Sequence, residues 1–352
     1  MTFETPLTVS GPFRSPAQML QEQSFSGQTS VHDNATAARL GLAGAPIEAP
    51  THFSQFDPLA FAVWGRQWFE RGCVSAHFRT MVVEGEQVQA SLTTTGPASA
   101  TIEAHKPDGT PVLAGTASIG PDHPESELTR RLGALGDPGE LHIVDLLTVG
   151  TRRDRPVTVT IRRTKSNGAG YPFSLDQKLA HITESSPWYD ADDATSNPWG
   201  RAIVPFEMIS VLASKSGFGW PVRGPALGLF LDLEIRMVNG PIFVDQQYDI
   251  TRELVGLSQS RRTESYWTRS TLSDTGSDDP VAEVLLLPAC SRTPMRATRS
   301  RSPRTSGERA RTTRRHPRRR RRPESCTIPG ATLLTRWRRR PPRSLPAPTP
   351  DR

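Results

Sequence analysis

Residues 32–53 read HDNATAARLGLAGAPIEAPTHF, and the first half of the chain is organised around this stretch. It predicts a polar loop, a short helix, a Gly-rich turn and the start of a long helix. The long helix is expected from His52 to Phe69, and aromatic or aliphatic residues occur on several sides of it. An apolar surface all round a helix indicates that the helix is buried.

Strand-like segments follow this helix, at Ser75–Val83, Glu86–Thr95, Ala100–Lys106 and Thr110–Ile119. A buried helix succeeded by a run of antiparallel strands predicts an α+β unit in which a sheet wraps around the helix.

The second half of the chain repeats this order. A second buried helix is expected at Phe206–Ser216, and its strands at Gly228–Val238, Ile242–Ser258, Thr263–Ser273 and Val281–Leu287. Pro50 and Pro205, which begin the two long helices, are 155 residues apart. Gly85 and Gly240, which are expected to turn the two hairpins, have the same offset. Short helices are expected at Pro16–Leu20 and Leu175–Leu179, and further strands at Leu141–Val149 and Pro156–Arg163.

These patterns divide the chain into four parts. Residues 1–120 form a first unit and residues 141–287 a second, separated by a polar linker at 121–140 that is rich in Pro and Gly. Residues 288–352 are expected to be a disordered tail rich in Arg and Pro.

The charge of the chain is unevenly distributed. The net charge of +7 arises because residues 291–352 contain 20 Arg and only 3 acidic residues, whereas the remainder has a net charge of −10. Two interpretations of the tail stand: a basic arm that binds nucleic acid through phosphate contacts, or the product of a frameshift in GC-rich DNA. We favour the second, since 39 arginines against 4 lysines in the whole chain suit GC-rich codons. For the acidic body, nucleic-acid binding is not expected.

Cysteine usage and hydropathy predict a reduced cytoplasmic protein. Cys73, Cys290 and Cys326 form no CxxC pair and have no metal-ligand spacing. The N-terminal sequence MTFETPLTVSGPF lacks the basic and apolar regions of a signal peptide. No apolar run approaches the roughly 20 residues that span a bilayer.

The opening stretch resembles the hotdog fold, specifically the MaoC-like (R)-specific enoyl-CoA hydratases and acyl dehydratases. The resemblance rests on His32, Ala38, Gly41 and the turn Pro46-Ile47 that leads into Pro50-Thr51-His52. The turn Val83–Val88 is also similar to that family. With the internal repeat, the resemblance implies a double hotdog, in which two antiparallel sheets each wrap a central helix.

The resemblance implies that His32 is the catalytic histidine, which in these hydratases works with an upstream Asp and Asn to add water to an enoyl thioester. In this chain Gly27 and Thr29 stand at those two positions. Asp33 is adjacent to His32 as a candidate substitute or substrate contact, although neighbouring side chains usually diverge. A structural role for His32 in its loop is an equal alternative.

The start of the long helix is a second candidate site, because its dipole favours negative charge that develops on a thioester carbonyl. Thr51 would contact the substrate there and His52 would act as a base. With the offset of 155, His52 corresponds to Glu207, so the two could form a pseudo-symmetric site. Bonding of His52 to a neighbouring carbonyl, and helix capping by Glu207, are the structural alternatives.

Further candidates for substrate binding lie outside the central helices. Trp199 and Arg201 could line an acyl or phosphopantetheine channel, and Arg261 and Arg262 could bind coenzyme A phosphates. Packing of the tryptophan and a solvated strand end are the more common explanations.

The expected function is therefore that of an acyl-thioester hydratase or dehydratase. The alternatives are a thioesterase, in which Glu207 activates water, and a non-catalytic acyl-CoA-binding protein. The expected partner is an acyl-CoA or acyl-carrier-protein thioester, and no metal or other cofactor is expected. The sequence leaves the oligomeric state open, a homo-oligomer included.

Overall fold

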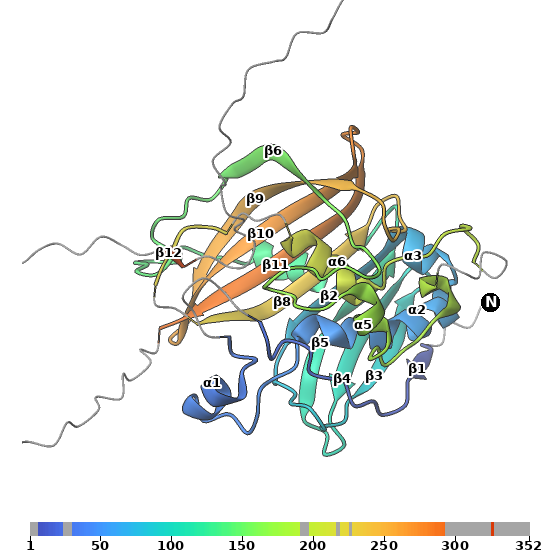
Figure 1. Cartoon of the computed structure of the whole chain (residues 1–352), viewed down its shortest axis with the longest axis horizontal. Coiled ribbons are helices and arrows are strands. Elements are labelled where there is room, and N and C mark those ends of the chain that lie inside the picture. The colour runs from blue at the N-terminus through green and yellow to red at the C-terminus, as the bar shows by residue number, and fades with distance from the viewer. Residues whose placement is uncertain are drawn as a thin grey trace, which may run out of the picture.

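The computed structural model describes residues 6–23, 30–190, 197–215, 219–224 and 227–292, together with the two-residue strand at 325–326. Gly27, Thr29 and nearly all of the basic tail, about which the sequence made predictions, lie outside the described residues. Within the described part, ten strands form one antiparallel sheet in the order β1-β3-β4-β5-β2-β8-β11-β10-β9-β6 (Figure 1).

The sheet is built from two similar halves. The first half contains β1 (Thr8–Ser10), β2 (Gly72–Phe78), β3 (Gln89–Gly96), β4 (Ser99–His105) and β5 (Pro111–Ile119). The second contains β6 (Arg152–Val159), β8 (Gly228–Met237), β9 (Tyr248–Gln259), β10 (Thr263–Asp274) and β11 (Pro280–Ser291). A separate short pair joins β7 (Val222–Arg223) to β12 (Ser325–Cys326). The two halves run outward from the centre in equivalent orders, 2-5-4-3-1 and 8-11-10-9-6, so the repeat predicted from the sequence is confirmed.

The two predicted sheets are joined at the centre of the molecule. Strand β2 pairs with β8 over five residues, from Cys73 opposite Arg236 to His77 opposite Asp232. The double hotdog is therefore one continuous sheet, with each half curved around its own helices.

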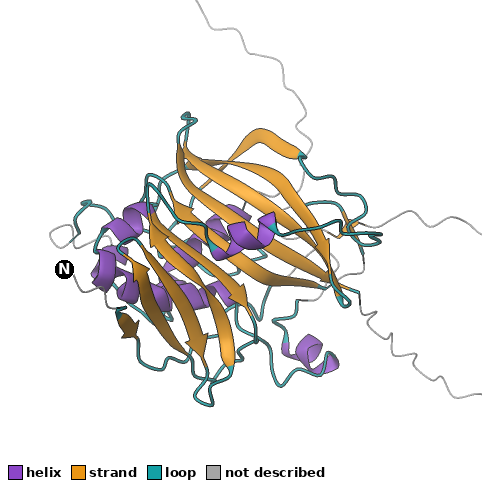
Figure 2. Ribbon diagram, turned by 180° about the vertical axis from the view of Figure 1, so that it is seen from behind, coloured by secondary structure: helices purple, strands orange, loops and turns teal. Residues whose placement is uncertain are grey.

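Helices cover mainly one face of this sheet (Figures 1 and 2). They are the 3₁₀ helix η1 (Ala49–Phe56), α2 (Asp57–Trp64), α3 (Gln67–Arg71), α5 (Leu175–Leu179), the 3₁₀ helix η2 (Pro187–Tyr189) and α6 (Phe206–Ser214). Helix α1 (Asn34–Arg39) stands apart from the strands in both views. Helix α4 (Glu127–Gly133) lies within the predicted linker and packs on β2 and β8. Its Leu128 is buried with Trp267 and Leu285 in a small second layer.

The single long helix predicted from His52 to Phe69 is three helices. A 3₁₀ turn leads to Asp57, Pro58 then occupies the first turn of α2, and Gly65 ends α2 with a φ of +60°. Proline at a helix start and glycine in the left-handed region at a helix end are both favourable, which explains the breaks.

Other segments also differ from prediction. The strand predicted at Ile242–Ser258 begins only at Tyr248, and the one predicted at Pro156–Arg163 lies at Arg152–Val159. Leu141–Val149 is not a strand, because the N–H groups of His142, Ile143 and Val144 all donate to the buried Glu264 carboxylate instead of to a neighbouring strand. Residues 16–20 form no helix. Strand β11 continues to Ser291, beyond the boundary predicted at residue 287, and pairs with both neighbours.

The pairing of the two halves also corrects the predicted offset. The bond from Ile47 N–H to Val82 O in the first half is equivalent to the bond from Val204 N–H to Ile242 O in the second. The two donor residues are 157 positions apart, and the two acceptor residues are 160 positions apart. The counterpart of Gly85 is therefore Asp245, and both have positive φ. Gly240 lies before that turn, and its N–H donates to Glu70 O.

Candidate active site

His32 is fixed by the backbone that leads into η1. Its Nδ1 lies 2.6 Å from the carbonyl oxygen of Pro46, and its N–H donates to Ser30 Oγ. A carbonyl oxygen only accepts, so Nδ1 carries the proton and Nε2 of the neutral ring holds the lone pair. Burial lowers the pKa of His32, opposed by the bond to Pro46. At neutral pH the side chain is therefore a neutral imidazole with a basic Nε2.

A second group of polar side chains lies at the starts of the two central helices. We call Glu48, Thr51, His52, Lys178 and Glu207 the helix-start cluster; each is 6% exposed or less. Lys178 Nζ is 3.0 Å from Thr51 Oγ1 and 3.1 Å from Glu207 Oε1. The structure thus brings together His52, Thr51 and Glu207, three of the residues singled out in the sequence, and adds Lys178 and Glu48.

Burial dominates the electrostatics of this cluster. It lowers the pKa of His52 to about 4, with smaller contributions from Lys178 and Lys106. It raises the pKa of Glu48 to about 7, against an opposing effect of Lys178. It also raises the pKa of Glu207, again opposed by Lys178. A buried carboxyl that titrates near pH 7 is suited to proton transfer at neutral pH.

The raised pKa of Glu48 predicts a pH dependence of stability. Between the unfolded pKa near 4.5 and the folded pKa of about 7, the folded state binds more protons than the unfolded state, so this group's contribution to stability falls as pH rises. We expect the unfolding free energy of the wild type to fall between pH 5 and pH 8. In Glu48→Gln this fall should be smaller by about 2 kcal/mol. Urea unfolding at both pH values measures it, and Glu84→Gln, at an exposed turn residue, serves as control. An equal pH dependence in wild type and Glu48→Gln would contradict it.

The remaining predicted site residues are placed elsewhere. Asp33 caps α1, where its carboxylate accepts from the N–H groups of Ala35 and Thr36. Trp199 packs on Phe69 and Trp188 and donates to Glu70. Arg201 is exposed and lies over the ring of Phe243.

Arg261 and Arg262 lie exposed in the hairpin between β9 and β10. The geometry does not bring these two arginines, Trp199 or Arg201 into the helix-start cluster, so their roles in substrate binding stay predictions.

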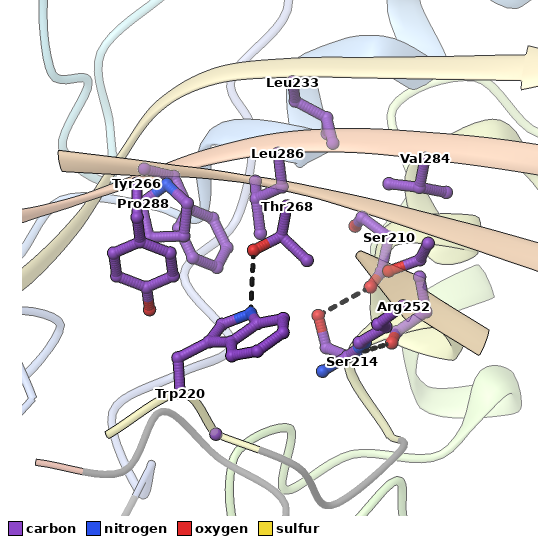
Figure 3. A pocket seen from close by; sticks show the side chains of 14 residues that line it. Ser210, Ser214, Trp220, Leu233, Arg252, Tyr266, Thr268, Val284, Leu286 and Pro288 are labelled. Atoms are coloured by element: carbon purple, nitrogen blue, oxygen red, sulfur yellow. Dashed lines mark hydrogen bonds between the residues drawn. The ribbon is translucent and has the colours of Figure 1, made fainter. Parts of the chain in front are cut away.

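A pocket opens between α6 and the second half of the sheet (Figure 3). The space in it that the centres of water-sized molecules can occupy is about 50 Å³. The floor of the pocket is apolar and consists of Leu233, Val284 and Leu286. The Trp220 ring lies at one side, and its Nε1 donates to Thr268. Arg252 lines the same pocket and donates to the carbonyl of Ala213 in the last turn of α6.

The pocket and the helix-start cluster are adjacent along α6. Ser210, which lines the pocket, is one turn after Glu207 and donates to its carbonyl oxygen. Tyr171 connects the same two regions, because its OH donates to Ser214 at the pocket and its pKa is raised by burial and by Glu48.

Sequence reasoning missed Glu48 and Lys178. Glu48 is an acidic residue inside the otherwise apolar run APIEAP of the opening stretch, which is an available signal for a buried carboxyl. Lys178 offers no such signal, because its neighbours in the cluster are distant in sequence. The corrected offset of 157 also places Glu207 opposite Pro50 rather than His52, so the pair does not occupy equivalent positions.

The described residues contain no group of three His, Cys, Asp or Glu side chains arranged to hold a metal ion. Nor does any helix in the described ranges have the length and apolar character needed to cross a membrane.

Comparison with known proteins identifies the fold. No protein-family model matches the chain, and no curated protein matches it in sequence. Among solved structures, a candidate MaoC domain dehydratase from Chloroflexus aurantiacus J-10-fl is similar at 13% identity, with a TM-score of 0.51 and coverage of 83% of this chain and 96% of that chain. A Mycobacterium tuberculosis protein described as a double hotdog is similar at 12% identity, with a TM-score of 0.49 and coverage of 82% and 97%. The likeness to the first of these structures, together with the sheet order of the two halves, confirms the resemblance at the level of the fold: this chain has a double hotdog fold.

Proposed function

We propose that the chain is an acyl-thioester hydratase or dehydratase in which His32 is the general base. The observation that carries this proposal is the bond from His32 Nδ1 to Pro46 O, which leaves Nε2 as the basic atom of a half-buried, neutral ring. A fixed tautomer that is unprotonated at neutral pH is the state that general-base catalysis requires.

In the hydration direction, His32 Nε2 takes a proton from water while the water oxygen bonds to the β-carbon of the enoyl thioester. The electron pair of the double bond moves to the α-carbon and thioester carbonyl. The proton that His32 took from the water is then delivered to the α-carbon, which completes the reaction and restores the neutral ring. Negative charge that develops on the carbonyl is favoured near the N-terminal ends of the central helices.

The pocket under α6 suits the acyl chain of such a substrate. Its floor is apolar, it is open at one side, and it begins one helical turn from Glu207. Burial of each methylene of an acyl chain contributes about 0.8 kcal/mol.

This assignment predicts that filling the pocket changes chain-length preference. Ser270 lines the pocket, whereas Thr271, its neighbour on β10, points to the other face of the sheet. We expect Ser270→Phe to lower kcat/KM at least 10-fold for eight-carbon enoyl-CoA but less than 3-fold for four-carbon enoyl-CoA. Thr271→Phe is the matched control. Equal effects on both chain lengths would show that the acyl chain binds elsewhere.

A second candidate is thioester hydrolysis. It is favoured by the buried carboxyls Glu48 and Glu207 at the helix starts, either of which could activate water. Lys178, which is 3.1 Å from Glu207, favours the carboxylate form that a base requires.

One assay separates these activities. The protein is incubated with enoyl-CoA esters of four to twelve carbons, while the conjugated double bond and free thiol are followed together. Loss of the double bond without thiol establishes a hydratase, and release of thiol a thioesterase. If the folded protein binds the ester and gives neither signal, it is a non-catalytic acyl-thioester-binding protein.

A further inference from the structure

The helix-start cluster contains one cation that contacts both halves of the molecule. Lys178 extends from α5, and its side chain is 3% exposed. Its ammonium reaches Thr51 on η1 of the first half and Glu207 on α6 of the second, at 3.0 and 3.1 Å. It also lies 5.6 Å from the ring centre of Phe173.

Fold stability is a poor explanation for this lysine. Transfer of an ammonium and a carboxylate from water to the interior costs several kcal/mol for each ion, and apolar replacements of such pairs are often neutral or stabilising. The ammonium moreover faces the first turns of two helices, whose N-terminal ends are positive and disfavour a cation. The position is therefore electrostatically costly for the fold.

We propose that Lys178 is a positioning residue of the active site, whose ammonium holds Thr51 and Glu207 together across the two halves. This inference rests on the proposed acyl-thioester chemistry and concerns its second candidate, in which Glu207 activates water. A compact ammonium has three donors, so it can contact the hydroxyl and the carboxylate at the same time.

The titration of His52, the residue after Thr51, reports the position of this ammonium. Lys178 and Lys106 both lower its pKa, in addition to burial. Lys106 is itself paired with Glu86 at 2.7 Å. The acidic groups of the cluster are Glu48, from the segment before η1, and Glu207, from α6.

The amide of Gln55, one turn after His52, approaches its ring. Gln55 Nε2 lies 3.4 Å from His52 Nδ1, so Nδ1 accepts and Nε2 of the neutral ring carries the proton.

The decisive experiment is an NMR titration of His52 in the full chain labelled with ¹³C-histidine. His52→Gln identifies the resonance. Lys178→Met removes the charge with little change of volume, and Lys165→Met, at an exposed lysine, is the matched control. We expect Lys178→Met to raise the pKa of His52 by at least half a unit and Lys165→Met to leave it unchanged.

Turnover provides the second readout. Lys178→Met is expected to lower kcat at least 10-fold with KM changed less than 3-fold, and Lys178→Arg to restore part of kcat. If Lys178→Met does not fold, Lys178→Gln, which keeps donors for Thr51 and Glu207 but carries no charge, tests the same shift.

An unchanged pKa of His52 in folded Lys178→Met or Lys178→Gln would overturn the proposal. So would wild-type kcat in Lys178→Met. If the wild type turns over no thioester, the proposed function fails, but the titration of His52 still tests the role of Lys178.

Discussion

Replacement of His32 by glutamine is expected to lower kcat/KM for enoyl-CoA hydration by a factor of 10² to 10⁴, which is the usual contribution of a positioned general base. Glutamine can still donate to Pro46 O from its amide, but it has no basic atom to replace Nε2. The loop should therefore keep its structure while proton transfer is lost. The measurement is the decrease of enoyl absorbance under substrate-limiting conditions.

The matched control is His142→Gln, since the His142 side chain is 65% exposed and lies in the loop before Asp145. Its kcat/KM should equal that of the wild type. The pH profile adds a second check: because burial lowers the pKa of His32, activity should persist below pH 6.5 and fall only as the ring becomes protonated at lower pH. His32→Gln activity within 3-fold of the wild type would remove His32 from the mechanism.

Replacement of Trp68 by alanine is expected to produce the largest loss of stability, about 3–5 kcal/mol. The side chain is fully buried, and its ring stacks on Phe206 of the second half at 4.7 Å and on Trp64 at 6.0 Å. Its Nε1 donates to Asp57 Oδ1 at 2.9 Å. Alanine therefore leaves a cavity between the halves and removes a donor from a buried carboxyl.

Trp68→Phe separates these two effects. It keeps one ring for stacking, removes the hydrogen bond and leaves a smaller cavity than alanine, so a smaller loss of about 1–3 kcal/mol is expected. Asp57 would keep two donors, the Tyr189 OH at 3.0 Å and the Phe206 N–H. The pKa of Asp57, already raised to about 7 by burial, should then rise further.

The unfolding free energies are compared by guanidinium titration followed by circular dichroism. Trp199→Ala, at a half-buried tryptophan, should cost less than Trp68→Ala. Equal losses for the two alanine variants would show that Trp68 does not join the halves.

The difference between local and tertiary information is clear in the helices. Pro58 and Gly65 mark the breaks in the predicted long helix, and both signals are present in the sequence, but the continuous apolar pattern outweighed them. The predicted strand at Leu141–Val149 failed for a reason that is not local. Its N–H groups bind Glu264, more than 100 residues away, and its apolar side chains pack in a small cluster around Trp220.

The site shows the same division. His32, Thr51, His52 and Glu207 could be selected from the sequence because motif spacing and helix starts are local features. Glu48 and Lys178 could not be assigned to the cluster, since Lys178 lies 127 residues from Thr51. Substrate roles for Arg261 and Arg262 were suggested by their positive charge alone. A charge in the sequence does not show whether its end of the strand lies near the site.

The sequence by itself determined the double hotdog, because two buried helices, each followed by strands in the same order, leave few ways to bury both apolar surfaces. Tertiary structure alone decided that β2 and β8 join the two halves into one sheet, and that an ammonium from α5 lies between the first turns of both central helices. The physical reason is that apolar periodicity is a local property of the chain. Burial, ion pairing and pKa instead depend on which distant segments exclude water together.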